Sequence, residues 1–563
     1  MPYPESMRES LNLVEKTRSK RVERAKTGQP IYEPMSISER DEILKKFHPD
    51  YQADALREIR IGPNKGERLT AGVVDILERH SRINPDEIDL SKVDYNVDVL
   101  IIGGGGGGCM AAIWAMKEGV DNILISTKLR VGDANSIMSQ GGMQAAVNPH
   151  DSPVIHYLDI MGGGHFDNIP ELVKTLTTEG PYIAKFLLDL GVMWDRTSDD
   201  HLQTKPGGGT SRRRMLSARD YTGAEIMRVL RDEVRNHPDK INVLEFSPAV
   251  ELILDKEGKC AGAILMQTET GEYVIVRAKS TIIATGGFGR LHIKGFPTTN
   301  HYGATADGLV IAYRAGAKLL YMDSVQYHPT GAVYPEQVWG FLITEKIRGF
   351  GGQPVNRFGE IFVFPLEPRD VEAANFIREC AEGRGVKTTT GKCGIWLDSP
   401  VIEMLNGEGT IEKAFPAMLR QFHRFDIDIR KEPMLVYPTL HYQNGGIQIN
   451  ERSETSIPNL YAAGEVSGGL HGRNRLMGNS VLDYNVFGRR AGIFAAQNAR
   501  KTEIGELTLE HVKSYEEEIK DVGIETKKIS PIIFPDYRNW EVVKKHRKSP
   551  DPFIGFALTG WQE

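Results

Sequence analysis

An apolar run that stops at six consecutive glycines constrains the fold of this chain more than any other stretch. Residues 97–112 read VDVLIIGGGGGGCMAA. The change from β-branched residues to glycine and then to helix formers predicts a buried strand, a tight turn and a helix. Gly103, Gly105 and Gly108 satisfy the spacing GxGxxG, in which the glycines make the turn, admit a pyrophosphate and let the helix pack closely on the strand. We therefore expect a dinucleotide site here, since a flexible linker would lack such sharp boundaries.

The residue at the end of the next predicted strand helps to distinguish between dinucleotides. About twenty residues after the glycines, an NAD site places Asp or Glu, which binds the ribose hydroxyls. This chain reads ILISTK there, with Ser126 at the corresponding position. The lack of an acidic residue makes NAD a poorer fit and favours FAD.

The composition of the 563-residue chain excludes several classes of protein. Its net charge is −6, and no dense Lys/Arg block is interleaved with aromatic residues, so nucleic acid is not expected as a partner. The N-terminus lacks the apolar core of a signal peptide, and no run of about 18 uncharged apolar residues occurs. We expect a cytoplasmic protein that reaches the cytoplasmic face of a membrane only through partner subunits.

The cysteines do not suggest a metal centre. Cys109, Cys260, Cys380 and Cys393 form no CxxC pair. Zinc and iron–sulfur sites need clustered ligands at short spacings. No metal site is expected in this chain, and any iron–sulfur centre that it uses is expected in a partner.

Charged, helix-forming segments flank the glycine-rich middle of the chain. In SISERDEILKKF, Ser38 and Asp41 stand at the spacing of a capping box, and Ile43, Leu44 and Phe47 share one face behind them. The stretch LEHVKSYEEEIKDV predicts another helix near the C-terminus. The N-terminal helix is interpreted either as an element packed on the core or as an arm that docks a partner.

Three further motifs occur in an order that is typical of one family. DANSIMSQGGMQAAV follows the glycine turn, and YAAGEVSGG and NSVLDYNVFGRRAG lie far downstream. Together with the glycine turn, they make the region from about 95 to about 500 resemble the flavoprotein subunits of fumarate reductase and succinate dehydrogenase. The resemblance implies that FAD is bound by residues from both ends of this region. The implied cofactor residues are Gly103, Gly105, Gly108, Ser126, Lys128, Asn135, Ser136, Gln140, Gly141, Gly142, Thr285, Gly286, Asp307, Glu465, Ser480 and Leu482.

One departure from the family pattern concerns the attachment of the flavin. Members with covalently bound FAD have a histidine five residues before the glutamine of the SQGG turn, and this chain has Asn135 there. The resemblance therefore implies FAD held without a covalent bond. In the family, loss of that bond tends to lower the flavin potential, which favours fumarate reduction over succinate oxidation.

Five stretches supply the residues that the resemblance assigns to the substrate. They are VQYHPTG, FLITEKIRGFGG, EPRDVEAA, YPTLHYQNGGI and HGRNRLMGNS. The implied contacts to a dicarboxylate such as fumarate or succinate are His328, Thr344, His441 and Arg475. Arg369 is the implied proton donor, and Glu345 and Arg348 would reprotonate it from solvent.

These residue types suit the reduction of a small dianion. An arginine binds a carboxylate through two parallel N–H groups, as Arg475 would here. Hydride addition to one alkene carbon leaves carbanion character on the other, and a positioned acid must neutralise it. Arg369 can act as that acid because the carbanion is the stronger base, and its cation stabilises the developing charge. The local patterns predict a turn at His328 and glycine-rich loops at His441 and Arg475, and they place Glu345 three residues before its partner, where the two can meet.

Two departures leave room for a different acid. Phe350 replaces the glutamate of the family's RGEGG segment, and Arg473 adds a cation near Arg475. A longer or differently charged unsaturated acid is therefore an alternative to fumarate. The motifs also suit an L-aspartate oxidase, a succinate dehydrogenase flavoprotein or a flavin-dependent electron relay, although a relay would not need the dicarboxylate residues.

The expected architecture is α/β, with a Rossmann-like FAD-binding domain split in sequence by an inserted α+β capping domain. The site would lie between these two domains. Electrons are expected from an iron–sulfur subunit, as in the family, because the chain has no second dinucleotide motif. The predicted segments are an N-terminal helical extension (1–92), the two parts of the FAD-binding domain (93–321 and 439–500), the capping domain (322–438) and a helical C-terminal tail (501–563).

Overall fold

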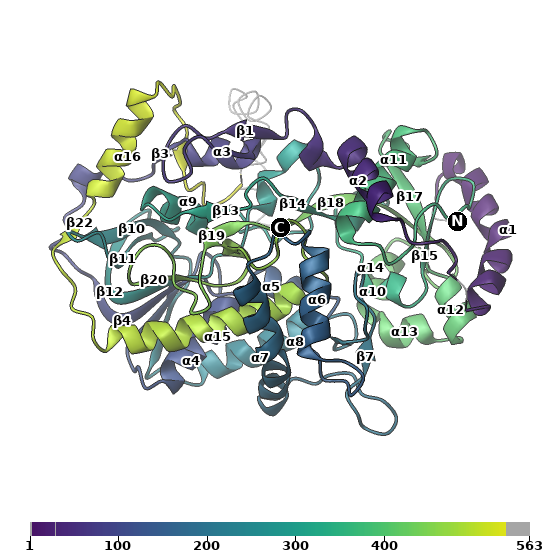
Figure 1. Cartoon of the computed structure of the whole chain (residues 1–563), viewed down its shortest axis with the longest axis horizontal. Coiled ribbons are helices and arrows are strands. Elements are labelled where there is room, and N and C mark those ends of the chain that lie inside the picture. Colours follow the sequence, from purple (N-terminus) through teal and green to yellow (C-terminus); the bar gives the residue numbers. More distant parts are fainter. Residues whose placement is uncertain (1–2, 29, 536–563) are drawn as a thin grey trace, which may run out of the picture.

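Two β-sheets organise residues 3–28 and 30–535, which the computed structural model describes (Figure 1). The larger described sheet takes strands from both sides of the smaller one in sequence. Its strands are β4 (Tyr95–Ile102), β5 (Ile123–Ser126), β9 (Ile241–Leu244), β10 (Ala249–Asp255), β11 (Cys260–Met266), β12 (Tyr273–Ile283), β20 (Leu460–Ala462) and β22 (Leu507–Thr508). The strands of the smaller sheet are β14 (Val325–Ala332), β15 (Gln353–Val355), β16 (Val386–Lys387), β17 (Cys393–Asp398) and β18 (Met434–Gln443).

Helices pack around both sheets, and the mixture confirms the predicted α/β class. The helices used below are α1 (Glu5–Lys26), α2 (Ile37–Phe47), α3 (Ala71–Leu77), α4 (Gly106–Lys117), α5 (Asn135–Met138), α6 (Pro153–Gly163), α7 (Pro170–Asp189), α8 (Thr222–Arg235), α9 (Asp307–Arg314), α10 (Lys346–Gly349), α11 (Arg369–Ala381), α15 (Asn479–Ala499) and α16 (Glu510–Asp521). Of these, α4 and α15 lie along one face of the larger sheet.

The parallel strands of the larger sheet end at one common region. β20, β12, β4, β5 and β9 are parallel, whereas β10, β11 and β12 form an antiparallel meander. The last four residues of β4 are buried, as expected for a strand covered on both faces. Residues that follow β4, β12 and β20 line the same cavity. This edge is where an α/β sheet binds ligands.

Helix α15 lies directly on α4 because small residues face the contact (Figure 1). A Cβ atom at Gly492 would lie 2.3 Å from the carbonyl oxygen of Ala111, and one at Gly488 would lie 2.7 Å from that of Gly107. Any larger residue at these positions would push the two helices apart. The contact brings the downstream NSVLDYNVF motif, at the start of α15, to the glycine turn.

The smaller sheet organises the inserted capping segment. β14 pairs antiparallel with β18, and β17 connects β18 to β15 and β16. Its core, which includes Phe376, Trp396 and Phe415, is separate from the core of the larger sheet. Strand β18 runs through the predicted boundary between residues 438 and 439. We therefore propose the same division of the chain with this boundary moved to the end of β18.

The N-terminal extension contributes to both cores. Met7 and Val14 of α1 are buried in the core of the capping segment, whereas Val73 and Val74 of α3 are buried in the core of the larger sheet. The purple segment in Figure 1 accordingly runs from α1, at one end of the molecule, to α3 beside the larger sheet. These apolar faces are used by packing within the chain, which is one of the two sequence interpretations.

The capping box of α2 lies two residues earlier than predicted. The Ser36 hydroxyl accepts from the Glu39 N–H (3.4 Å), and the Glu39 carboxylate accepts from the Ser36 N–H (2.7 Å). Ser38 and Asp41 both lie inside the helix, so their assignment as the box was wrong. The glutamate at this spacing reaches back to the N-cap amide, and the apolar face behind it packs on α11 as expected.

The predicted C-terminal helix is present as α16. The hydroxyl of Tyr515 donates to the Leu77 carbonyl oxygen (2.8 Å), which ties α16 to α3. The remainder of the predicted tail, residues 536–563, lies outside the described residues. Among the helices of the described part, none is both long and apolar enough to cross a bilayer.

Candidate active site

The six glycines form the turn between β4 and α4. Gly103 adopts φ +119°, and a Cβ atom there would lie 2.3 Å from the carbonyl oxygen of Ala284. A Cβ atom at Gly108 would lie 1.8 Å from the Gly103 carbonyl oxygen, so the helix can approach the strand only without a side chain. Helix α4 starts at Gly106, and its first turn lines a cavity. The positive end of the helix dipole at this point favours a phosphate.

The cavity that extends from this turn has a volume of about 1570 Å³, including its open mouth. It is lined by most of the residues that the resemblance assigned to the cofactor. These are Gly103, Gly105, Ser126, Lys128, Asn135, Ser136, Gln140, Gly141, Gly142, Thr285, Gly286, Asp307, Glu465 and Ser480. Two assigned residues lie outside the lining: Gly108 is packed behind the turn, and Leu482 is buried on α15.

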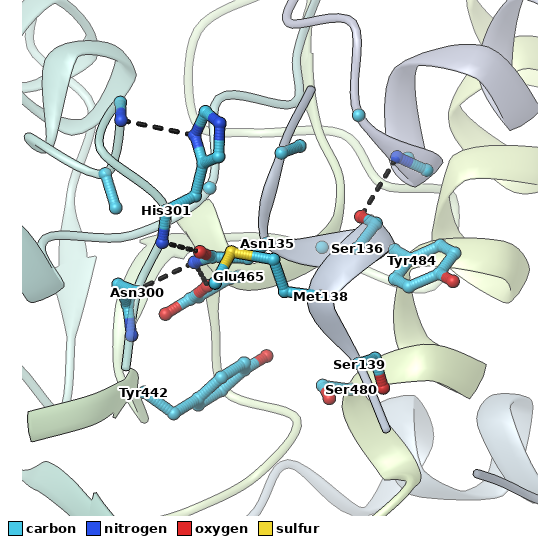
Figure 2. Close-up of a pocket in the computed structure, with 18 of the residues that line it drawn as sticks. Asn135, Ser136, Met138, Ser139, Asn300, His301, Tyr442, Glu465, Ser480 and Tyr484 are labelled. Atoms are coloured by element: carbon cyan, nitrogen blue, oxygen red, sulfur yellow. Dashed lines mark hydrogen bonds between the residues drawn. The ribbon is translucent and has the colours of Figure 1, made fainter. Parts of the chain in front are cut away.

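Asn135 is held by three neighbours on the cavity wall, as Figure 2 shows. Its amide nitrogen donates to Asn300 Oδ1 (2.9 Å) and to Glu465 Oε2 (3.2 Å), and its oxygen accepts from the His301 N–H (2.6 Å). Burial raises the pKa of Glu465 to about 7, although its hydrogen bonds with Gln443 and Asn135 oppose the shift. The side chain at the position of the covalent histidine is therefore fixed by hydrogen bonds within the protein.

The opposite part of the cofactor lining contains a buried ion pair. Lys128 contacts Asp307, which begins α9, and also donates to Thr305 Oγ1 (2.6 Å). Ser126 donates to the Ser247 carbonyl oxygen (2.5 Å), so its hydroxyl proton is used within the fold. Both residues come directly after or at the end of β5, in agreement with their predicted place beside the dinucleotide.

The lining fits FAD by its shape and by its free polar atoms. The glycine turn forms a concave backbone surface that Cβ atoms would fill. Among the described residues, the buried Oε1 atom of Gln140 has no hydrogen-bond partner, although buried polar atoms are normally paired. The N-terminus of α4 and the segment 135–142 are the groups that would hold the pyrophosphate and the flavin.

Two arginines meet at the other end of the same cavity. Nη1 of Arg369 and Nη2 of Arg475 donate to one atom, Gln326 Oε1, at 2.9 and 3.0 Å. Both arginines line the cavity and are almost fully buried. Burial, and then the charge of Arg369, lowers the pKa of Arg475 to about 9. Two cations held this close, with one amide oxygen between them, form a site for an anion.

Two neutral histidines and a threonine line this end as well. The rings of His328 and His441 lie 4.9 Å apart, and burial followed by the charge of Arg369 lowers the pKa of each well below its usual value. Nδ1 of His328 accepts from the Thr330 N–H (3.2 Å), which leaves the ring hydrogen on Nε2, free to donate. Thr344 lines the cavity beside them.

The local structure predicted for both histidines was wrong. His328 lies in strand β14 and His441 in β18, and neither is in a turn or loop. The HPTG sequence resembles a turn because it contains proline and glycine. In the structure it forms an irregularity in β14, where the register with β18 shifts between His328 and Gly331. Arg475 does lie in a loop, as predicted.

Behind Arg369 lies a buried line of alternating charges. Nε of Arg369 donates to Glu345 Oε2 (2.7 Å), and Nη2 of Arg348 lies 3.4 Å from the same oxygen. The Gly208 N–H fixes the other carboxylate oxygen of Glu345 (2.8 Å). Burial raises the pKa of Glu345, but Arg369 and Arg348 outweigh burial and keep it below the usual value. Arg348 itself does not line the cavity; it reaches Arg369 only through Glu345.

The two departures from the family pattern do not change the cavity. Arg473 pairs with Asp167 and Asp323 and does not line the cavity. Its expected effect on the charge near Arg475 is therefore not seen. Phe350 also lies outside the lining and packs against Phe415.

Sequence reasoning missed Gln326 and Asn300, which connect the predicted residues. Gln326 stands two residues before His328 on β14, so strand alternation would have placed both side chains on one face. Asn300 donates to the His441 carbonyl oxygen (2.6 Å) and accepts from Asn135. No local pattern marks Asn300, because its partners are far away in sequence.

Comparisons with known proteins agree with this geometry. A family model described as an FAD binding domain matches residues 98–481. The chain is 41% identical to a subunit of the fumarate reductase (CoM/CoB) of Methanothermobacter marburgensis, over 76% of this chain and 77% of that protein. It is 36% identical to the L-aspartate oxidase of a Nostoc species, over 76% and 73%. Among solved structures, a variant of FrdA from E. coli quinol fumarate reductase aligns with a TM-score of 0.68 and 29% identity, over 76% and 74%.

The comparisons and the FAD-shaped cavity lead to the same assignment. The chain is an FAD-dependent oxidoreductase, and it belongs to the FAD-binding family that includes the flavoprotein subunits of fumarate reductase and succinate dehydrogenase.

Proposed function

We propose that this chain is the catalytic flavoprotein subunit of a fumarate reductase-type complex, which reduces fumarate to succinate. The observation that carries the proposal is the meeting of Arg369 and Arg475 on Gln326, in the cavity that begins at the glycine turn. A site for flavin alone would not need two buried cations beyond the cofactor. A small dianion next to a flavin uses both of them.

The residues of the acid end divide into binding and proton transfer. Arg475 would bind one carboxylate through two parallel N–H groups. His328, whose Nε2 carries the hydrogen, would donate to the other carboxylate, and Thr344 and His441 would add hydrogen bonds. These contacts would fix the alkene carbons beside Arg369.

Bound FAD would supply the hydride to one alkene carbon. Arg369 would then protonate the other carbon, and its cation would stabilise the negative charge that develops there. Glu345 and Arg348 would return a proton to Arg369 from solvent. The 2.7 Å contact between Arg369 and Glu345 supports this assignment.

Several finer features belong to the same proposal. FAD would be held without a covalent bond, because Asn135 has no nucleophile for the flavin. Electrons would come from a separate iron–sulfur protein, in keeping with the name of the Methanothermobacter relative, which describes one subunit of a larger fumarate reductase. Membrane contact, if the complex has one, would be made through such partners on the cytoplasmic side.

L-aspartate oxidase is the second candidate, because the Nostoc relative with that name is 36% identical. An oxidase of L-aspartate would use the same arginines for the two carboxylates of its substrate. Succinate oxidation and reduction of a related unsaturated acid also use this site geometry. Assays with these substrates therefore have to accompany the fumarate assay.

The test uses the purified FAD-loaded chain without oxygen. Its flavin is reduced with a viologen dye, and reoxidation is followed after addition of fumarate. Iminoaspartate formation from L-aspartate is measured in parallel. We expect rapid reoxidation by fumarate and no turnover of L-aspartate. The reverse pattern would establish the oxidase, and no response to either substrate would reject the assigned acid site.

A further inference from the structure

The line of buried charges behind Arg369 continues beyond Arg348. Nη1 of Arg348 contacts the carboxylate of Glu372 on α11 and donates to the Pro365 carbonyl oxygen (2.7 Å). The side chains of Arg348 and Glu372 are fully buried. Glu372 is outside the cavity lining, so it touches neither the acid end nor the cofactor region.

Another buried carboxylate, Glu367, lies where the chain enters α11, five residues before Glu372. It accepts from the Met35 N–H (2.7 Å) and pairs with Arg40 (2.8 Å). Its side chain is fully buried, whereas that of Arg40 is 34% exposed. Met35 and Arg40 belong to the N-terminal extension, so this segment forms the outer end of the charged line.

The balance of charge argues that Glu372 is more than an ion-pair partner. Arg348 already has a buried carboxylate in Glu345, and a second buried acid costs desolvation free energy. Burial raises the pKa of Glu372 well above its usual range despite Arg348, and the charges of Glu345 and Glu367 act in the same direction as burial. Burial also raises the pKa of Glu367. A buried carboxyl that keeps its proton is suited to pass it on.

We propose that Glu372 and Glu367 extend the proton relay from Arg348 to the surface at Arg40, and that the N-terminal extension completes its outer end. The proposal rests on the proposed function, in which Arg369 gives up one proton in each turnover. It assigns the N-terminal extension a role in catalysis in addition to its packing.

One proton moves along the line in each turnover. When Arg369 protonates the substrate carbon, it regains a proton through Glu345 from Arg348. Arg348 takes its replacement from the Glu372 carboxyl. Glu372 is then reprotonated by way of Glu367 from water at the surface. Only N–H and O–H bonds break and form, and no oxidant or reductant is needed.

The test compares Glu372→Gln with the matched variant Glu379→Gln in the full FAD-loaded chain. Glu379 is also a buried acid on α11, but it pairs with Arg384 and does not contact Arg348. With reduced viologen and fumarate, we expect Glu372→Gln to lower kcat by about tenfold or more while KM changes little. The solvent isotope effect on kcat should rise, and added formic acid should restore part of the rate. Glu379→Gln should change none of these values.

A second measurement does not depend on turnover. Infrared spectra of the flavin-free protein at neutral pH should show the C=O band of a protonated buried carboxyl, and Glu372→Gln should remove it. Arg40→Ala, which changes only the partly exposed outer end, should give a smaller fall in kcat with the same rise in isotope effect. This variant also serves if Glu372→Gln does not fold.

Two results would overturn the relay: an unchanged infrared band in Glu372→Gln, or wild-type kcat and isotope effect in the folded variants. A wild-type protein that does not reduce fumarate would instead overturn the proposed function. In that case the infrared band still decides whether Glu372 holds a proton.

Discussion

The two ends of the cavity are built in different ways. The cofactor end is formed by backbone from one short stretch, and it depends on the side chains that Gly103 and Gly108 lack. The acid end is formed by buried charged side chains from distant segments, which are held by one another. Substitutions at the first end should therefore disturb structure and cofactor binding, whereas substitutions at the second should change chemistry in a protein that still binds FAD.

The largest effect is expected for Arg369→Ala. Without the proton donor, kcat for fumarate reduction should fall by about 1000-fold or more, while the FAD content stays that of the wild type. Flavin absorbance and reoxidation kinetics measure the two quantities. Arg378→Ala, on the same helix, is the control and should retain activity. Substantial activity in Arg369→Ala would mean that another group is the acid.

The next largest effect tests the cofactor end. In Gly103→Ala the new methyl group would lie 2.3 Å from the Ala284 carbonyl oxygen, at a φ of +119°. We expect a destabilised turn and purified protein with little FAD, as measured by flavin content and thermal unfolding. Gly162→Ala on α6 is the control, because nothing lies within 4 Å of its Cβ position. Normal FAD content in Gly103→Ala would refute the role assigned to this turn.

A smaller effect concerns Glu465, which stands between the two ends. Burial raises its pKa to about 7, against about 4.5 in the unfolded chain. The folded state therefore holds the proton more tightly, and this group's contribution to stability is lost as the pH rises from about 4.5 to 7. The loss amounts to about 3 kcal/mol. Unfolding of flavin-free protein at several pH values should show this fall in the wild type and not in Glu465→Gln; parallel curves would contradict the prediction.

The smallest effect is expected for Arg475→Lys, which keeps the charge and removes the second N–H group for a carboxylate. KM for fumarate should rise about tenfold, equivalent to about 1.4 kcal/mol, with a smaller change in kcat. The control is Arg473→Lys in the same loop, since Arg473 pairs with Asp167 and Asp323 outside the cavity. Equal effects of the two variants would show that Arg475 has no special place in binding.

The same contrast explains what could be predicted from sequence. The glycine turn is local, so the spacing of Gly103, Gly105 and Gly108 was sufficient to predict the strand, the turn and the helix. Most of the other cofactor and substrate residues came from the family resemblance, and the structure brings them to one cavity.

The failures were of two kinds. His328 was expected in a turn because its proline and glycine outweighed the strand pattern, although pairing with β18 decides its structure. Gln326 and Glu372 were missed because their roles depend on contacts with residues that are 24 to 149 positions away. Such contacts have no local signal.

The assignment of the acid end is tested most directly by a crystal structure of the FAD-loaded protein with malonate, a dicarboxylate that cannot be reduced. We expect one carboxylate to accept two hydrogen bonds from Arg475 and the other to lie within hydrogen-bond distance of His328 and Thr344. Arg369 should stand beside the central carbon. Malonate bound elsewhere, or bound in the cavity without contact to Arg475 or Arg369, would contradict the assignment of this end to a dicarboxylate.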